Sequence, residues 1–422
     1  FLLHQELNKG VHGFEGGSGV VFPGVQDSTW TYDEKAGAWY FHRFYKHQAD
    51  LNIANPAVRR EIEKIMGFWL ELGVSGFRID AVPFLIEPQG DPPEGLADPH
   101  RYLTEMRDFL AWRKAAAILL AEANITMDEV PSYFGDGDRM HMIFNFLLNQ
   151  HLFLALARGE AEPVRRMLSE VPEIHSTAQW ATFLRNHDEL DLGRLSEAER
   201  REVFAAFAPD KSMQLYERGI RRRLAPMLGG DLRRLKMAHS LMFALPGTPV
   251  IWYGEEIGMG EDLDLDERNA VRTPMQWDDT RNGGFSEGPA RSLVRAPPTG
   301  PFGPDRVNVL GQRDVDGSLL DFVRRLVQTR RACPEIGWGR WTTLPVEAPG
   351  VLAFRCEWRG GAVVTLHNLA DSEAEVTVGG PAGAEYLCLV AEDTARPHCR
   401  ADDRIRLPPY GTRWLRLRRH PE

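Results

Sequence analysis

The sequence predicts an α/β fold: a (β/α)8 barrel of the TIM type, followed by a small antiparallel β-sandwich domain. Between about residue 56 and about residue 335, apolar strand-like runs alternate with helical segments, which is typical of a parallel sheet. Three of these runs end in an acidic residue, at the place where such barrels carry their catalytic groups. From about residue 336 the pattern changes to short β runs separated by Gly, Asp and Pro turns.

Composition limits the classes of function. The 422 residues suffice for two domains and a large core, and 43% hydrophobic with 26% charged residues is ordinary for a soluble globular protein. A net charge of −10 argues against nucleic acid or an anionic membrane as the main partner. No signal stretch opens the chain and no apolar run reaches membrane-spanning length, so we expect a cytoplasmic protein.

The cysteines all lie in the last quarter of the chain, without the Cys-x-x-Cys spacing of a metal site. They are Cys333, Cys356, Cys388 and Cys399. We expect free thiols in a reducing cytosol, with paired disulfides as the alternative.

The first elements precede the predicted barrel. Residues 1–29 are rich in Gly and predict a mobile loop, and residues 30–55 predict loop and short strand. Asn55 followed by Pro56 predicts a helix start, with Asn55 as the N-cap. Apolar residues then recur at helical spacing until Gly73.

The helix leads into the central stretch of the chain, residues 76–82 with the sequence GFRIDAV. It reads as a buried strand in which Arg78 and Asp80, two residues apart, share one face. A buried carboxylate is costly unless it is paired, and Arg78 supplies the partner that keeps Asp80 ionised, as a nucleophile requires. A structural salt bridge in an α/β protein is the alternative.

Further strands follow at regular intervals. The run 118–124, ILLAEAN, places Glu122 at its end, and the run 183–189, FLRNHDE, ends in His187 and Asp188. Residues 140–146 and 248–254 complete a set of five strands, and Glu255 follows the last of them. Helices are predicted between the strands and after them, over residues 102–112, 147–156, 162–168, parts of 195–223, 232–245 and 318–331.

The motifs together resemble the α-amylase family, glycoside hydrolase family 13. The three acid-bearing runs resemble three conserved regions of that family. Within it the likeness points to the trehalose synthases (maltose α-D-glucosyltransferases), on five further stretches: WYFHRF at 39–44, HQADLN at 47–52, YFGDGD at 133–138, GIRRRLAP at 219–226 and VRTPMQW at 271–277. The likeness runs from about residue 30 to about residue 286 and then weakens.

The resemblance implies roles for the acids. Asp80 would be the nucleophile that forms a covalent glucosyl-enzyme, and Glu122 the general acid/base with a pKa tuned upward. Asp188 would hold two sugar hydroxyls and stabilise the transition state.

Other residues would bind the substrate. His187 would donate to a hydroxyl of the same glucose, and Arg78 would keep Asp80 ionised. Arg272 lies in a motif that resembles a lid over the substrate. Glu255, next to Glu256, would line either the pocket or the rim of the barrel.

The resemblance also predicts an incomplete barrel. The five strands match the fourth to eighth of the family, and neither the first three strands nor the family's Asp-x-x-x-Asn-His region has a counterpart. We therefore expect residues 1–55 to be the end of an inserted subdomain and a loop, 56–335 the catalytic barrel, and 336–422 the β-sandwich.

The expected function is retaining α-glucosyl transfer that interconverts maltose and trehalose by intramolecular rearrangement. An α-glucosidase or amylase-type hydrolase is one alternative, and an inactive sugar-binding fragment is another.

Small sugars are the expected partners, and a homo-oligomer is compatible with the resemblance. No cofactor is predicted from the residues. The family leaves calcium open, but the acidic run 261–267 lacks the Gly and spacing of an EF-hand and favours a solvated loop.

Overall fold

The computed structural model describes residues 3–4, 21–22, 27–87, 98–381, 383–391 and 397–418. The chain forms two compact units. One consists of residues 1–144 and 172–179, the other of residues 145–171 and 180–422. Most of the expected loop at residues 1–29 lies outside the described residues.

The first unit combines a small antiparallel sheet with three parallel strands. The small sheet has the order β1-β3-β2, with bounds Leu3–His4, Ala38–Phe41 and Trp30–Asp33. The parallel strands are β4 (Gly76–Ile79), β5 (Ile118–Ala121) and β6 (Met142–Phe144), and β5 pairs with both others. The helices are α1 (Pro56–Glu71), α2 (Val82–Ile86), α3 (Arg101–Arg113) and α4 (Val130–Phe134).

Helix α1 begins as the sequence predicts, because the Asn55 side chain accepts a hydrogen bond from the amide of Ala57 and Pro56 occupies the first turn. Its apolar periodicity is only partly used for packing. Met66 and Leu70 are buried. A second set of large apolar side chains, at i, i+3, i+4 and i+7, is between 47% and 63% exposed: Ile65, Phe68, Trp69 and Leu72. We call these four residues the α1 stripe.

The second unit begins with the remaining parallel strands and their helices. Strand β7 (Gln179–Phe183) pairs in parallel with β11 (Thr248–Val250). Short strands β8 (Leu190–Asp191), β9 (Gln214–Leu215) and β10 (Gly219–Ile220) form a separate sheet. The helices are α5 (Phe146–Arg158), α6 (Glu162–Glu170), α7 (Glu197–Phe207), α8 (Leu224–Met227), α9 (Leu232–Ala244), α10 (Val309–Gln312), α11 (Leu319–Arg331) and α12 (Pro334–Trp338).

The expectation that residues 195–223 are helical only in parts is confirmed. Only α7 is helical there, besides the turn η1 (Lys211–Met213), because the chain turns into β9 and β10. Further 3-10 turns follow β11: η2 (Glu255–Ile257), η3 (Glu267–Val271), η4 (Arg281–Gly284), η5 (Ala290–Ser292) and η6 (Gly300–Phe302).

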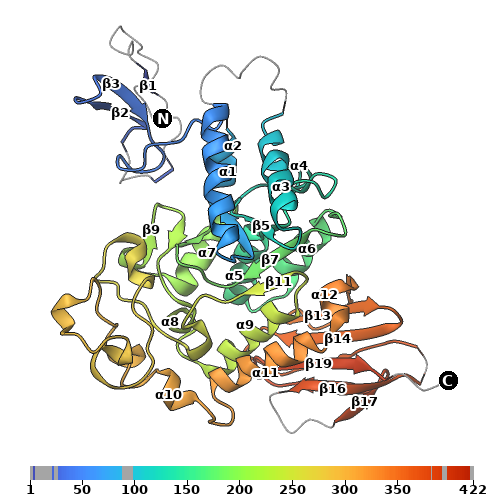
Figure 1. Ribbon diagram of the computed structural model, residues 1–422. Helices are drawn as coiled ribbons and strands as arrows, with labels where there is room; N and C mark the ends of the chain where they lie inside the picture. Colours follow the sequence, from blue (N-terminus) through green and yellow to red (C-terminus); the bar gives the residue numbers. More distant parts are fainter. Residues whose placement is uncertain are drawn as a thin grey trace. The chain divides into compact units, whose positions relative to one another are not determined.

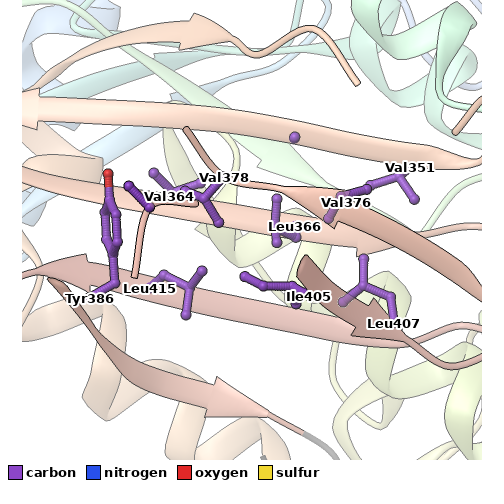
Figure 2. Close-up of a cluster of buried hydrophobic side chains, with 11 residues drawn as sticks. Val351, Val364, Leu366, Val376, Val378, Tyr386, Ile405, Leu407 and Leu415 are labelled. Carbon is purple, nitrogen blue, oxygen red and sulfur yellow. The ribbon is translucent and has the colours of Figure 1, made fainter. Parts of the chain in front are cut away.

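The last part of the second unit is a β domain. Six antiparallel strands have the order β12-β13-β14-β19-β16-β17, and β15 pairs with β18. Their bounds are Arg340–Thr343, Val351–Trp358, Gly361–Asn368, Thr412–Leu417, Glu385–Ala391, His398–Arg400, Ala374–Thr377 and Arg404–Leu407. Side chains from both sheets meet in one apolar cluster that includes Val351, Leu366, Ile405 and Leu407 (Figure 2).

Helix α9 lies beside the strands of the β domain (Figure 1). A cluster of buried polar side chains joins the two. Ser240 Oγ lies 3.0 Å from His367 Nε2 and 2.8 Å from Thr412 Oγ1, and it accepts a hydrogen bond from Trp414 Nε1 at 2.9 Å. The cluster fixes the helix against β14 and β19 because buried polar groups must find partners.

Candidate active site

Asp80 follows directly on β4, and Arg78 of that strand reaches it. Arg78 Nη1 donates to Asp80 Oδ1 at 2.7 Å, as expected from two residues on one face. The same guanidinium also contacts Glu122, with 2.6 Å between Nη2 and Oε2. One arginine therefore bridges two carboxylates, which the spacing of Arg78 and Asp80 alone does not reveal.

The expectation of a buried Asp80 is wrong. Its side chain is 69% exposed, because it stands beyond the last paired residue of β4. Solvent rather than desolvation therefore dominates its surroundings, and the pairing with Arg78 orients the carboxylate more than it compensates for burial.

Glu122 follows directly on β5 and has different surroundings. Its side chain is only 19% exposed. Burial raises its pKa to about 7, a hydrogen bond with Asp80 acts in the same direction, and the charge of Arg78 opposes the rise. The pair thus consists of an exposed carboxylate and a carboxyl group that holds its proton near neutral pH.

The backbone fixes this arrangement. The amide of Glu122 donates to the Ile79 carbonyl at 3.0 Å, and the amide of Val82 donates to the Glu122 carbonyl at 3.0 Å. The amide of Ala81 donates to Glu122 Oε2 at 3.2 Å. Ala81 has a φ of 45°, a left-handed conformation that turns the chain immediately after Asp80.

The second unit carries the other predicted acid, Asp188, which lies between arginines. Arg272 Nη2 is 2.5 Å from Asp188 Oδ1 and Arg272 Nε donates to the His187 carbonyl at 2.7 Å. Arg268 Nη1 lies 3.4 Å from the same oxygen, and Arg185 donates to the Asp188 carbonyl at 2.6 Å. The structure thus brings together Asp188, His187 and Arg272.

Sequence reasoning missed Arg268 as a neighbour of Asp188. Arg268 also pairs with Glu189, with 2.6 Å between Nε and Oε2, and its guanidinium lies 5.6 Å from the ring of Tyr216. Arg268 lies far from Asp188 in the sequence, and no motif links the two residues. The two acids of the motif RNHDE were the one feature of the sequence that favoured a neighbouring arginine.

His187 lies against an aromatic side chain. The centroids of the His187 and Trp252 rings are 5.8 Å apart, and the His187 Nε2 is 3.6 Å from Asp188 Oδ2. The Trp252 Nε1 is buried and receives no hydrogen-bond partner among the described residues.

Glu255 lies in a different environment. It is 3% exposed, its Oε1 pairs with Arg223 Nη1 at 3.0 Å, and its Oε2 accepts from the amide of Leu224 at 3.1 Å. Burial raises its pKa, and the charge of Arg223 opposes the rise. In the structure both carboxylate oxygens of Glu255 have partners, one in Arg223 and one in the amide of Leu224. The predicted contact of Glu255 with substrate stays a prediction.

The acidic run 261–267 does not fit a calcium ion. Arg221 donates from Nη2 to the Leu263 carbonyl at 2.7 Å and from Nη1 to the Leu265 carbonyl at 2.5 Å. The positively charged guanidinium of Arg221 therefore already binds these two carbonyl oxygens. Glu261 is paired with Arg222 at 2.8 Å. Within the described residues no group of three or more His, Cys, Asp or Glu is arranged to hold a metal ion.

Parallel strands that are followed by acids, with an antiparallel β domain after them, define the class as an α/β protein with its candidate site at the carboxyl ends of the strands. The family model described as the alpha amylase catalytic domain matches residues 22–208 and 212–339. The model for the sucrose hydrolase-like C-terminal domain matches residues 360–416. The chain belongs to the alpha-amylase family, and its fold is that family's β/α barrel with a C-terminal β domain.

Several curated relatives are trehalose synthases. The trehalose synthase of Thermus thermophilus is 45% identical over 83% of this chain and 37% of its own length. The trehalose synthase/amylase TreS of Mycobacterium tuberculosis is 41% identical over 83% of this chain and 60% of its own length. The corresponding protein of Mycolicibacterium smegmatis is 37% identical over 94% and 70%. This chain therefore spans 37% of the length of the Thermus thermophilus protein and 60% of the length of the Mycobacterium tuberculosis protein.

Solved structures share the fold at low identity. Isomaltulose synthase from Klebsiella sp. LX3 superposes with a TM-score of 0.72 at 21% identity, covering 99% of this chain and 78% of that protein. The alpha-amylase from H. orenii has a TM-score of 0.70 at 21% identity, covering 93% and 70%. None of the helices in the described ranges is long and apolar enough to span a membrane.

Proposed function

We propose that this chain transfers α-glucosyl units with retention and interconverts maltose and trehalose by intramolecular rearrangement. The observation that carries the proposal is the Arg78 guanidinium between Asp80 and Glu122. It joins an exposed carboxylate to a carboxyl group whose pKa is about 7, the combination that a retaining mechanism requires. The trehalose synthases among the relatives supply the substrate class.

The proposed reaction proceeds in two steps. The Asp80 carboxylate attacks the anomeric carbon of maltose, while Glu122 gives its proton to the glycosidic oxygen that leaves. The released glucose turns without leaving the site. Its anomeric hydroxyl then attacks the glucosyl-enzyme, Glu122 takes the proton back, and Asp80 is freed as trehalose forms.

Other residues would serve binding. We propose that Asp188 and His187 contact sugar hydroxyls. We also propose that Arg272 orients Asp188, because its guanidinium lies 2.5 Å from the Asp188 carboxylate. Glu255 stays a proposed substrate-binding residue. We also propose that the parallel strands correspond to the fourth to eighth of the family's barrel, with domains at 1–55, 56–335 and 336–422.

A hydrolase is the second candidate, because the 69% exposure of the Asp80 side chain leaves room for water at the glucosyl-enzyme. The name synthase/amylase of the mycobacterial relatives points the same way. An inactive sugar-binding fragment is the third.

One experiment separates the three candidates. The purified chain is incubated with maltose in the presence of ¹³C-labelled free glucose, and the sugars are resolved by chromatography and mass spectrometry. Unlabelled trehalose supports intramolecular rearrangement, and glucose alone supports the hydrolase. A folded chain without any product rules out both enzymatic proposals.

The control is Asp80→Asn, which keeps the shape of the side chain but removes the nucleophile. We expect turnover to fall at least about a thousandfold while circular dichroism stays unchanged. Equal turnover by the variant and the unmodified chain would refute the assignment of Asp80.

A further inference from the structure

Arg223 is a buried arginine to which the proposed reaction assigns no role. It belongs to the run GIRRRLAP at 219–226, stands just before α8, and has an exposed fraction of 0%. Its charge is balanced by Glu255, whose Oε1 lies 3.0 Å from Arg223 Nη1 and whose Oε2 accepts from the amide of Leu224 at 3.1 Å. Because separating a buried ion pair is costly, the guanidinium is held in one position.

This guanidinium binds the chain on the amino-terminal side of Arg272. Arg223 Nη2 donates to the Val271 carbonyl at 3.0 Å, and Val271 is the last residue of η3. Arg223 and Val271 are both buried, and a hydrogen bond from a charged donor is stronger in such surroundings than in water. The peptide that precedes Arg272 is therefore fixed.

A tyrosine binds the chain on the other side of Arg272. The Tyr253 hydroxyl donates to the Thr273 carbonyl. Tyr253 is in turn held by Arg223, whose Nη1 donates to the Tyr253 carbonyl at 2.9 Å and whose guanidinium lies 5.1 Å from the centre of the Tyr253 ring. Arg223 thus fixes the backbone on both sides of Arg272, directly on one side and through Tyr253 on the other. We call these contacts the Arg272 clamp.

The residue inside the clamp holds the candidate site. Arg272 Nε donates to the His187 carbonyl at 2.7 Å, and its Nη2 lies 2.5 Å from Asp188 Oδ1. A planar guanidinium makes two such contacts only in one orientation, so the backbone that carries it must be placed accurately. A misplacement of about 1 Å, even far from the reacting atoms, can cost about a hundredfold in rate.

We propose that Arg223 is a positioning residue, which orients Asp188 by clamping the backbone of Arg272. It does not touch the substrate and acts only through Arg272. Its effect on the rate rests on the proposed function, whereas its effect on the placement of Arg272 does not. Lysine cannot replace it, because an ammonium group can pair with Glu255 but lacks the planar fork that reaches two carbonyls at once.

The first measurement is a double-mutant cycle on kcat/KM for maltose, with Arg223→Lys and Arg272→Lys. We expect Arg223→Lys alone to lower kcat/KM by about tenfold, because the clamp loosens. Since both substitutions disturb the same contact with Asp188, the double variant should fall no more than about threefold below Arg272→Lys alone. Two independent losses would multiply instead.

The matched control is Arg330→Lys, at another arginine that binds three backbone carbonyls. Its guanidinium donates to the carbonyls of Phe243, Leu245 and Gly247. These carbonyls precede β11, at the end of the strand opposite to the candidate site. We expect kcat/KM of Arg330→Lys to stay within about twofold of the unmodified chain, and its effect to multiply with that of Arg272→Lys.

The second measurement does not need turnover. Phenylglyoxal modifies arginine side chains, and peptide mass spectrometry gives the rate at each position. Because a charge-assisted pair ties Arg272 to Asp188, its modification should become about threefold faster or more in Arg223→Lys. Arg291, in the exposed turn η5, should react at the same rate in both proteins. Arg330→Lys should leave the rate at Arg272 unchanged.

Tyr253→Phe tests the clamp even if Arg223→Lys fails to fold. It removes the hydroxyl that binds the Thr273 carbonyl and leaves the ion pair of Arg223 with Glu255 in place. We expect this variant, too, to speed the modification of Arg272.

Two results would overturn the proposal: an unmoved modification rate at Arg272 in both Arg223→Lys and Tyr253→Phe, or losses in kcat/KM that multiply in the double variant. Faster modification of Arg272 in a chain without turnover would support the clamp and reject the proposed enzymatic function. Turnover of maltose with an unmoved modification rate in both variants would support that function and reject the clamp.

Discussion

At the scale of single residues, the arginine that bridges Asp80 and Glu122 has two opposite effects. It stabilises the ionised Asp80, and it lowers the pKa of Glu122, which burial and the hydrogen bond with Asp80 raise to about 7. A general acid works only while it holds its proton. The balance of these effects therefore sets the pH range of the proposed reaction.

The first prediction concerns this balance. The kcat/KM for maltose should fall above about pH 7, because Glu122 then loses its proton. In Arg78→Met the opposing charge is gone, so the pKa of Glu122 rises and the alkaline limb moves upward by about one pH unit, at a lower overall rate. The measurement is a pH profile of both proteins. A lower rate with an unmoved alkaline limb would contradict the assignment of Glu122.

A second prediction concerns Asp188. Arg272→Lys keeps the positive charge but loses the fork that contacts both the Asp188 carboxylate and the His187 carbonyl. We expect kcat/KM for maltose to fall by about ten- to a hundredfold, measured by initial rates. Arg291→Lys, a change in the exposed turn η5, is the control and should keep the rate of the unmodified chain.

The residue scale also shows the limits of prediction from sequence. Asp80, Glu122 and Asp188 could be chosen because each follows an apolar run. The contact of Arg78 with Glu122 and the pairing of Arg268 with Glu189 could not, because they join residues 44 and 79 positions apart. Such contacts depend on strand order and loop path, which short motifs do not encode.

At the scale of elements, the pairing of β4 with β5 depends on one glycine. A Cβ added to Gly76 would lie 2.4 Å from the Ile118 carbonyl oxygen, closer than real Cβ atoms come to backbone. Gly76 and Ile118 are partners in the paired strands β4 and β5, so neither backbone can move away freely. The strand that presents Asp80 therefore requires the absence of a side chain at its first position.

The corresponding prediction is that Gly76→Ala lowers the free energy of unfolding by about 2–4 kcal/mol, because the strands must separate to admit the methyl group. Urea denaturation measures the change. Gly337→Ala is the matched control: its Cβ would meet nothing within 4 Å, so we expect a change within about 0.5 kcal/mol. Equal effects of the two substitutions would contradict the close approach.

Elements with strong local signals were predicted well. The Asn55–Pro56 start of α1, the helix expected over residues 318–331 (α11) and the apolar helix expected over residues 232–245 (α9) all occur. Strands β12, β17 and β18 were not predicted, because they are three or four residues long and sit at sheet edges or in a two-stranded sheet. Strands this short show too little alternation to stand out from loops.

At the scale of the whole molecule, the family and the barrel-plus-β-domain fold could be predicted because several motifs occur in a fixed order. The stability of the assembled core could not, because it depends on which polar groups become buried. His367 is one example: burial lowers its pKa to about 3, and it contacts Ser240 inside the second unit. Its sequence position gave no sign of this.

A prediction for stability follows from His367. Its neutral form stabilises the fold fully above its unfolded pKa of about 6.5, and this contribution is lost as the pH falls below that value. Glu122, whose pKa is raised, changes in the opposite direction, so only a comparison of variants isolates the histidine. Between pH 7 and pH 5 the difference in unfolding free energy between the unmodified chain and His367→Gln should shrink by about 2 kcal/mol.

Urea denaturation at both pH values measures this difference, with the exposed His398→Gln as the matched control. A difference that stays constant across the two pH values would show that His367 is not held neutral by burial.

The α1 stripe has a consequence for the colloidal behaviour of the chain. Four large apolar side chains on one face of a helix attract one another between molecules, whereas the net charge of −10 keeps the molecules apart at neutral pH. Acidification removes that repulsion, and added salt screens it at separations beyond about 10 Å. The second virial coefficient should therefore turn negative in mildly acidic, salty solution, and dilute alkaline buffers should keep the protein dispersed.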